Sequence, residues 1–78
     1  MIRTRFEYLV AFVSNDRVLR TNGNWQGHVD EGEPNAEESC PSLFEYLNTA
    51  GNQGWELVSI DDEDVGTAQL YFKRAFHL

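Results

Sequence analysis

Cysteine, proline and long apolar runs are all scarce in this chain of 78 residues. Its single cysteine, Cys40, cannot form an internal disulfide, which is typical of a protein from a reducing compartment. No apolar run approaches the roughly 18 residues of a membrane helix, and the first residues lack the apolar segment of a signal peptide. We therefore expect a soluble, cytoplasmic protein with no membrane partner.

Positive charge is also scarce. Six Lys and Arg residues stand against thirteen Asp and Glu residues, which gives a formal net charge of −7. A chain with this balance is repelled by the phosphate backbone of nucleic acids, whose binding proteins gather Lys and Arg on one surface. We therefore expect no nucleic-acid partner.

Motifs that indicate metal binding or catalysis are missing as well. A structural zinc site needs about four paired Cys or His ligands, whereas His28, His77 and Cys40 are single and scattered. The acidic runs at 30–38 and 61–64 lack the spacing of a calcium loop. A Cys40–His28 pair has no orienting Asn or Asp, and its acidic surroundings raise the pKa of a thiol. The sequence thus predicts no cofactor, no metal and no catalytic residue.

Aromatic and β-branched residues are what the chain does have. Ten aromatic residues provide a core for one domain that covers residues 1–78. Their patterns predict strands at 5–13, 24–29, 55–60 and 67–76, with a polar loop at 30–39 and a charged turn at 61–66. The last two strands are close enough in sequence to form an antiparallel hairpin.

A helix is predicted between the loop and the third strand. Pro41 or Ser42 begins it, and Gly54 ends it in a left-handed conformation. Its apolar stripe consists of Leu43, Phe44, Leu47 and Ala50. The fold class is therefore α+β, an antiparallel sheet of three to four strands with one helix packed on one face. The element order is strand, strand, helix, strand, strand.

Two short motifs carry a resemblance to a known family. One is Gly-Trp-Glu-Leu-Val at 54–58, and the other is Phe-Lys-Arg at 72–74. With the aromatic strand at 5–13, they resemble the small bacterial proteins of domain of unknown function 4177 over residues 5–13 and 43–74. The resemblance implies the fold and no activity. The matched residues favour packing roles, with Gly54 in the turn and Trp55 beneath the helix end.

One stretch of the chain has the character of a recognition surface. Residues 24–28 place an aromatic, an amide and an imidazole beside glycine, although Trp25 alone is equally suited to covering the sheet. If a pocket forms between protomers, we expect Trp25, His28, Tyr71 and Arg74 to line it. Arg74 follows Lys73 in a strand, so these two side chains point to opposite faces.

Apolar residues fall on both faces of the predicted sheet, and one helix covers only one face. On the first strand, one face carries Phe6, Tyr8, Val10 and Phe12, and the other carries Leu9, Ala11 and Val13. On the third strand, Trp55 and Leu57 are assigned to one side, and Val58 and Ile60 to the other. The last strand divides into Leu70, Phe72 and Phe76 against Tyr71 and Ala75. We therefore expect a second subunit to cover the other face, most simply in a two-fold dimer.

Three hypotheses about function follow from these features. The first is a non-enzymatic, homo-oligomeric interaction or binding module. The second is a small-ligand-binding or sequestering protein with its pocket between protomers. The third, an enzyme, has the least support, because no acid–base or nucleophile set emerges. The sequence does not identify the ligand, the partner or the biological process.

Overall fold

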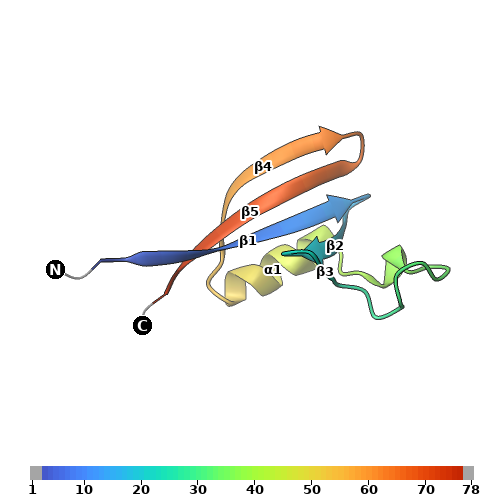
Figure 1. Ribbon diagram of the computed structural model, residues 1–78, viewed down its shortest axis with the longest axis horizontal. Helices are drawn as coiled ribbons and strands as arrows, with labels where there is room; N and C mark the ends of the chain where they lie inside the picture. The colour runs from blue at the N-terminus through green and yellow to red at the C-terminus, as the bar shows by residue number, and fades with distance from the viewer. Residues whose placement is uncertain (1–2, 77–78) are drawn as a thin grey trace.

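Five antiparallel strands and one α-helix make up the computed structural model, which describes residues 3–76 (Figure 1). The elements are β1 (Arg5–Ser14), β2 (Arg17–Thr21), β3 (Asn24–Trp25), a short 3-10 helix η1 (Glu37–Ser39), α1 (Leu43–Asn52), β4 (Glu56–Asp64) and β5 (Thr67–Phe76). In the sheet, the strands lie in the order β3-β2-β1-β5-β4. The predicted α+β class, antiparallel sheet and single α-helix are confirmed. The sheet has five strands rather than three to four.

The additional strand, β2, comes from two consecutive tight turns. Asn15 and Asp16 both have positive φ, 50° and 64°, so they form a two-residue turn that returns the chain along β1. Asn22 and Gly23, with φ of 50° and 84°, turn it again into β3. Because the ladder between β2 and β3 ends at Trp25, the strand predicted at 24–29 is reduced to two residues. The predicted strands at 5–13 and 24–29 left out the short strand between these turns.

The acidic run at 61–64 is part of β4, and its prediction as a turn was wrong. Asp61, Asp62 and Asp64 pair with Gln69, Ala68 and Thr67 of β5. The turn itself is only Val65-Gly66, with Gly66 at φ 80°. A strand at the edge of a sheet tolerates charged side chains because they reach solvent, and β5 provides the backbone partners. The predicted hairpin of the last two strands is confirmed.

Helix α1 is capped by Ser42. The Ser42 hydroxyl accepts a hydrogen bond from the Glu45 backbone N–H at 3.2 Å and lies 3.1 Å from the Glu45 carboxylate. Ser42 is therefore the helix cap, Leu43 is the first helical residue and Pro41 precedes the cap. The Glu45 carboxylate accepts from the Ser42 hydroxyl, whereas the Glu of a full capping box accepts from the backbone N–H of the cap residue. Phe44 does not belong to the apolar stripe, because its side chain is 76% exposed. The residues that face the sheet are Leu43, Tyr46, Leu47 and Ala50, at helical spacings of three and four.

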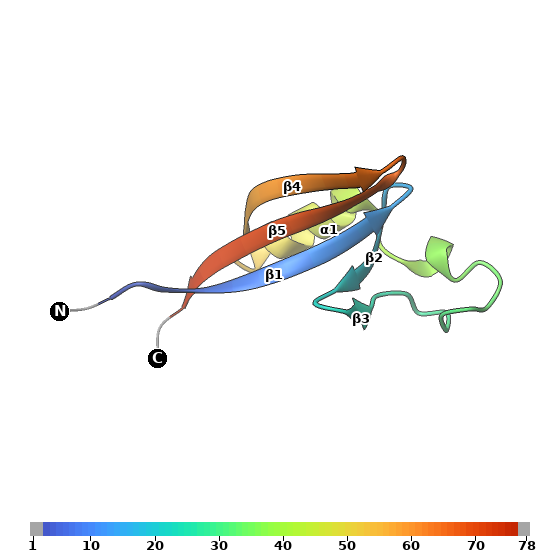
Figure 2. The same cartoon turned by 45° about the horizontal axis from the view of Figure 1, so that its top comes forward.

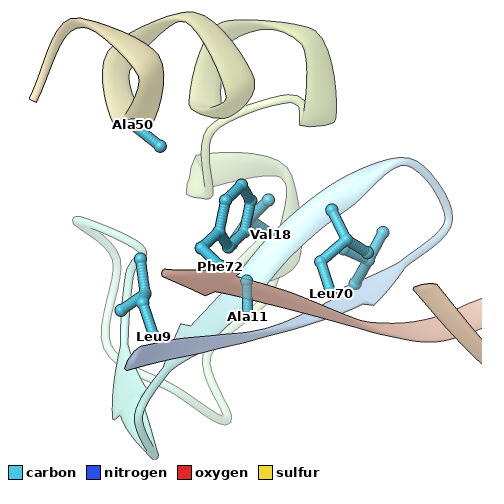
Figure 3. Packing of buried hydrophobic residues seen from close by; sticks show 7 residues of the cluster. Leu9, Ala11, Val18, Ala50, Leu70 and Phe72 are labelled. Carbon is cyan, nitrogen blue, oxygen red and sulfur yellow. The ribbon is translucent and has the colours of Figure 1, made fainter. Parts of the chain in front are cut away.

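The core lies between α1 and one face of the sheet (Figure 3). It is built from Leu9, Ala11 and Val13 of β1, Val18 of β2, Ala50 of α1, and Leu70 and Phe72 of β5. Phe72 is 2% exposed, and its ring meets that of Tyr46 edge to face with 6.1 Å between centroids. The part of this face formed by β1, β2 and β5 is therefore covered by α1, which buries the apolar residues that alternate along β1.

Gly54 ends the helix with φ of 89°, as predicted. A Cβ here would only contact the Arg74 side chain at 3.9 Å, so the cost of adding one is backbone strain rather than a clash. We expect Gly54→Ala to lower the free energy of unfolding by about 1 kcal/mol or more. Gly51 is the matched control, because it lies within α1 and has open space around it. Gly51→Ala should be neutral or stabilising by up to about 1 kcal/mol. Urea unfolding of both variants checks the prediction, and equal effects would contradict it.

Candidate functional site

The face of the sheet opposite α1 carries a row of large apolar side chains. Strand alternation and the β1–β5 register place Phe6, Tyr8, Val10 and Phe12 there with Gln69, Tyr71 and Lys73. We call this set the open face. Figures 1 and 2 show α1 on the other side of the sheet. Phe6 is 42% exposed and Tyr8 65% exposed, so the surface is accessible to a partner.

Cation–aromatic pairs lie at two places on the open face. The Lys73 ammonium is 4.8 Å from the centre of the Phe6 ring. Arg20 pairs with Phe12 on one side and Trp25 on the other, which places it in the same row. Its guanidinium carbon is 5.5 Å from the Trp25 ring. Both cations thus lie against aromatic rings, and the surface between them is apolar. An apolar surface bordered by polar groups is typical of a recognition surface.

The four predicted binding residues do not form one cluster within a single chain. Trp25 and Tyr71 share the open face, on β3 and β5. His28 is exposed in the loop that follows β3. Arg74 points to the opposite face of β5, because it pairs with Glu7 rather than with Tyr8. Any pocket that uses all four residues would need a second copy.

Arg74 makes three contacts at the carboxyl end of α1. It forms an ion pair with Glu7, and its Nη1 donates a hydrogen bond of 2.8 Å to the Gln53 carbonyl oxygen. Its guanidinium carbon lies 4.2 Å from the centre of the Trp55 ring. These contacts join β1 and β5 to the end of the helix, which is where Gly54 turns the chain. Within one chain, then, the contacts of Arg74 and Trp55 are with neighbouring elements of the fold.

A cleft lies beside Trp25 and the acidic loop at residues 30–38. Leu19, Arg20 and Trp25 border a cleft of about 470 Å³, and the remaining lining comes from residues 31–38. The Trp25 Nε1 donates to the Val29 carbonyl oxygen at 2.9 Å, and Arg20 forms an ion pair with Glu31. The glutamate carboxylates that line the cleft give it a negative charge. Among residues 3–76, however, no group of three or more His, Cys, Asp or Glu side chains is arranged to hold a metal ion.

A groove between α1 and β4 is the second apolar surface. Leu43, Leu47, Leu57 and Ile60 line much of its volume of about 460 Å³. Every residue of β4 is exposed, and Ile60 is 57% exposed. Leu57 and Ile60 share this face because the register shifts between Leu57 and Ser59. Their predicted placement on opposite sides was wrong, since strict alternation does not hold across a bulge.

Cys40 is buried, 1% exposed, in the loop before α1. Its carbonyl oxygen accepts a hydrogen bond from Arg17 Nη1 at 3.0 Å. Burial raises the pKa of the thiol above its ordinary value of 9.0, and the nearby Glu37 carboxylate adds to the rise. A protonated, buried thiol is a packed side chain rather than a nucleophile.

This raised pKa predicts a loss of stability in alkali. Below about pH 9 the thiol is protonated in both the folded and the unfolded chain, so it contributes no pH dependence. Above that pH the unfolded thiol ionises first, and the free energy of unfolding falls. Tyr46 acts in the same direction, because burial raises the pKa of its phenol. Urea unfolding at about pH 8 and pH 10 should show the fall, and Cys40→Ala and Tyr46→Phe should each reduce it. An undiminished fall in both variants would contradict this account.

Comparisons of the chain with protein-family models, with curated proteins and with solved structures gave no match. In the part of the chain that the structure describes, α1 is the α-helix, and neither its length nor its composition suits a membrane span. The open face is the candidate site because it gathers the exposed Phe6 and Tyr8 of β1 with the half-buried Phe12 of β1 and Tyr71 of β5.

Proposed function

We propose that this protein is a non-enzymatic, homo-oligomeric interaction module, a dimer in which a second copy covers the open face. The observation that carries the proposal is the uncovered row of Phe6, Tyr8, Val10 and Phe12 with Tyr71 beside it. The same strand buries Leu9, Ala11 and Val13 under α1, so β1 has apolar side chains on both faces. A half-solvated antiparallel strand ordinarily has polar residues on its outer face.

The accessible surface of the chain supports this proposal. A monomeric protein of 9.0 kDa is expected to expose about 4,850 Å², whereas this chain exposes 5629 Å². The excess of about 800 Å² is close to the area that each partner buries in a typical protein–protein interface. The elongated shape, 53 × 25 × 19 Å, is the reason for the excess, since α1 covers only part of one sheet face.

The alternative is a small-ligand-binding or sequestering protein with its pocket between protomers. Trp25 and Tyr71 favour it to the extent that both lie on the open face, where a second copy would enclose them. A thermal-shift screen separates the two functions. A ligand that binds only the folded dimer raises the melting temperature by mass action, and an interaction module without a pocket shows no such response.

Localisation and family are further proposals. We propose cytoplasmic localisation from the single cysteine, Cys40. We propose kinship with domain of unknown function 4177 from the motifs at 54–58 and 72–74. Enzymatic activity is not part of the proposal, because the open face offers aromatic rings and cations rather than an acid–base pair.

Sedimentation equilibrium at micromolar concentration tests the proposed function. The dimer is expected at twice 9.0 kDa, with dissociation on dilution. A species of 9.0 kDa at every concentration up to about 100 μM would overturn the proposal, because a stable interface of this size gives a tighter complex.

A further inference from the structure

Strand β4 forms an outer edge of the sheet, as Figures 1 and 2 show. It pairs with β5 on one side, and within residues 3–76 no strand pairs with its other side. The ladder with β5 is regular from Ser59 to Asp62, between the two bulges of the strand. Backbone N–H and C=O groups in this stretch therefore face solvent along the outer edge, where another strand can pair with them.

The groove between α1 and β4 lies along this edge and continues onto the helix. Leu43 and Leu47 line the groove, and they also line a concave region of about 420 Å³ beside Phe44. The two regions therefore form one apolar surface that extends from β4 to the exposed side of α1. On β4, Leu57 is 39% exposed and Ile60 is 57% exposed. An edge strand that only resists aggregation carries charged side chains at such positions, so this apolar surface is typical of an interaction site.

One end of the groove is acidic. The Asn15 N–H donates to the Gly66 carbonyl oxygen at 2.8 Å, which joins the turn after β1 to the turn after β4. Asp16 therefore lies at the same end as Asp62 and Asp64, and all three carboxylates line the groove. Among the described residues, no Lys, Arg or His lines it. The groove thus offers an apolar part for hydrophobic side chains and an acidic end for positive ones.

The charge of β4 decides between a second copy of this chain and a different partner. Five of the nine residues of β4 are acids, and none is Lys or Arg. Two copies joined edge to edge through β4 would therefore set five carboxylates against five, at the strand spacing of about 4.8 Å. Like charges directly opposite each other destabilise a strand pair, whereas opposite charges stabilise it. The strand that complements β4 therefore carries Lys or Arg, and it belongs to another protein.

We propose that β4 binds an extended, cationic segment of another protein as an additional strand of the sheet. Every second side chain of the added strand faces the groove, because side chains alternate along a strand. Its apolar side chains cover Leu57 and Ile60, and its Lys or Arg side chains lie beside Asp62 and Asp64. Backbone hydrogen bonds to residues 59–62 provide affinity, and the groove provides specificity. This inference goes beyond the proposed dimer and does not require it, because the groove lies on the helix side of the sheet.

Two synthetic heptapeptides test this proposal. In Val-Thr-Val-Thr-Lys-Thr-Lys, alternation places two apolar and two cationic side chains on one face of a strand. The matched control, Val-Val-Thr-Thr-Thr-Lys-Lys, has the same composition and charge but does not gather them on one face. Fluorescence anisotropy of labelled peptides should show saturable binding of the first below about 1 mM, at least about tenfold tighter than that of the second. Equal affinities, or no binding of the first peptide, would overturn the proposal.

Variants of the protein locate the binding site. Ile60→Ser removes an exposed apolar side chain from the groove and should weaken binding of the first peptide about tenfold. Asp62→Asn removes one carboxylate and should weaken it about threefold. The matched controls are Val65→Ser in the exposed turn after β4 and Asp30→Asn in the exposed loop, which should each change the affinity less than about twofold. Circular dichroism verifies that each variant is folded. Controls that weaken binding as much as the groove variants would contradict the site.

Amide hydrogen exchange, followed by NMR, tests strand addition itself. With the first peptide bound, the outward N–H groups among residues 59–62 should exchange at least about tenfold more slowly, because they then donate to the peptide backbone. A peptide that occupied the groove without forming a strand would leave these rates unchanged and would overturn the proposal. The dimer is tested separately by sedimentation. A monomer with slowed exchange at 59–62 loses the dimer and keeps this site, and a dimer without slowed exchange does the reverse.

Discussion

Replacing Phe72 by alanine is expected to lower the free energy of unfolding by about 3–5 kcal/mol. Phe72 is the largest fully buried side chain of the described residues, at 2% exposure. It pairs with Leu9 of β1 and Leu57 of β4, and it holds Tyr46 of α1 edge to face. Its truncation would leave a cavity under the helix that neither a rigid sheet nor a single helix can close.

Phe44→Ala is the matched control for that variant. Phe44 is 76% exposed on α1, so the same truncation removes little buried area, and alanine favours the helix. We expect a change within about 0.5 kcal/mol. Because a dimer's stability depends on concentration, urea unfolding should be followed at one protomer concentration. A small domain has roughly 5–15 kcal/mol in total, so the loss expected for Phe72→Ala is a large fraction of its stability. Equal effects of the two variants would contradict the core described above.

The second large effect is expected on assembly. Tyr8 is 65% exposed at the centre of the open face, so Tyr8→Glu should leave the fold intact while placing a charge in the proposed interface. We expect the dimer to weaken at least about a hundredfold, the size of effect typical of an interface aromatic residue. Sedimentation equilibrium measures the change, and circular dichroism verifies that the variant is folded.

Phe44→Glu distinguishes the open face from apolar surface elsewhere. It introduces the same charge at an exposed aromatic position, but on the helix side of the sheet. Its dimer should retain the wild-type affinity. If Phe44→Glu dissociates the dimer and Tyr8→Glu does not, then the interface lies on the helix side of the sheet, and the open face must be abandoned.

Local features could be predicted from the sequence because each depends on a few neighbouring residues. Ser42 is a typical cap residue at the start of a helix, and Gly54 predicts the left-handed end of the helix. The aromatic stretches predict β1 and β5, and together these elements specify the α+β class. Alternation along β1 also predicts that apolar residues lie on both faces of the sheet. Alternation likewise separates Tyr71 from Arg74, which are three residues apart on one strand.

Other features depend on which strand lies beside which, and only the tertiary structure decides them. The acidic run at 61–64 is a strand because its backbone pairs with β5. Leu57 and Ile60 share a face because β4 has a bulge where it pairs with β5. The exposure of Phe44 depends on where α1 lies on the sheet. The pairing of Glu7 with Arg74 has the same origin. Glu7 and Arg74 are far apart in the sequence, and they form an ion pair because β1 and β5 are antiparallel neighbours along their full length. A linear pattern contains the charges, but strand pairing sets their positions in space.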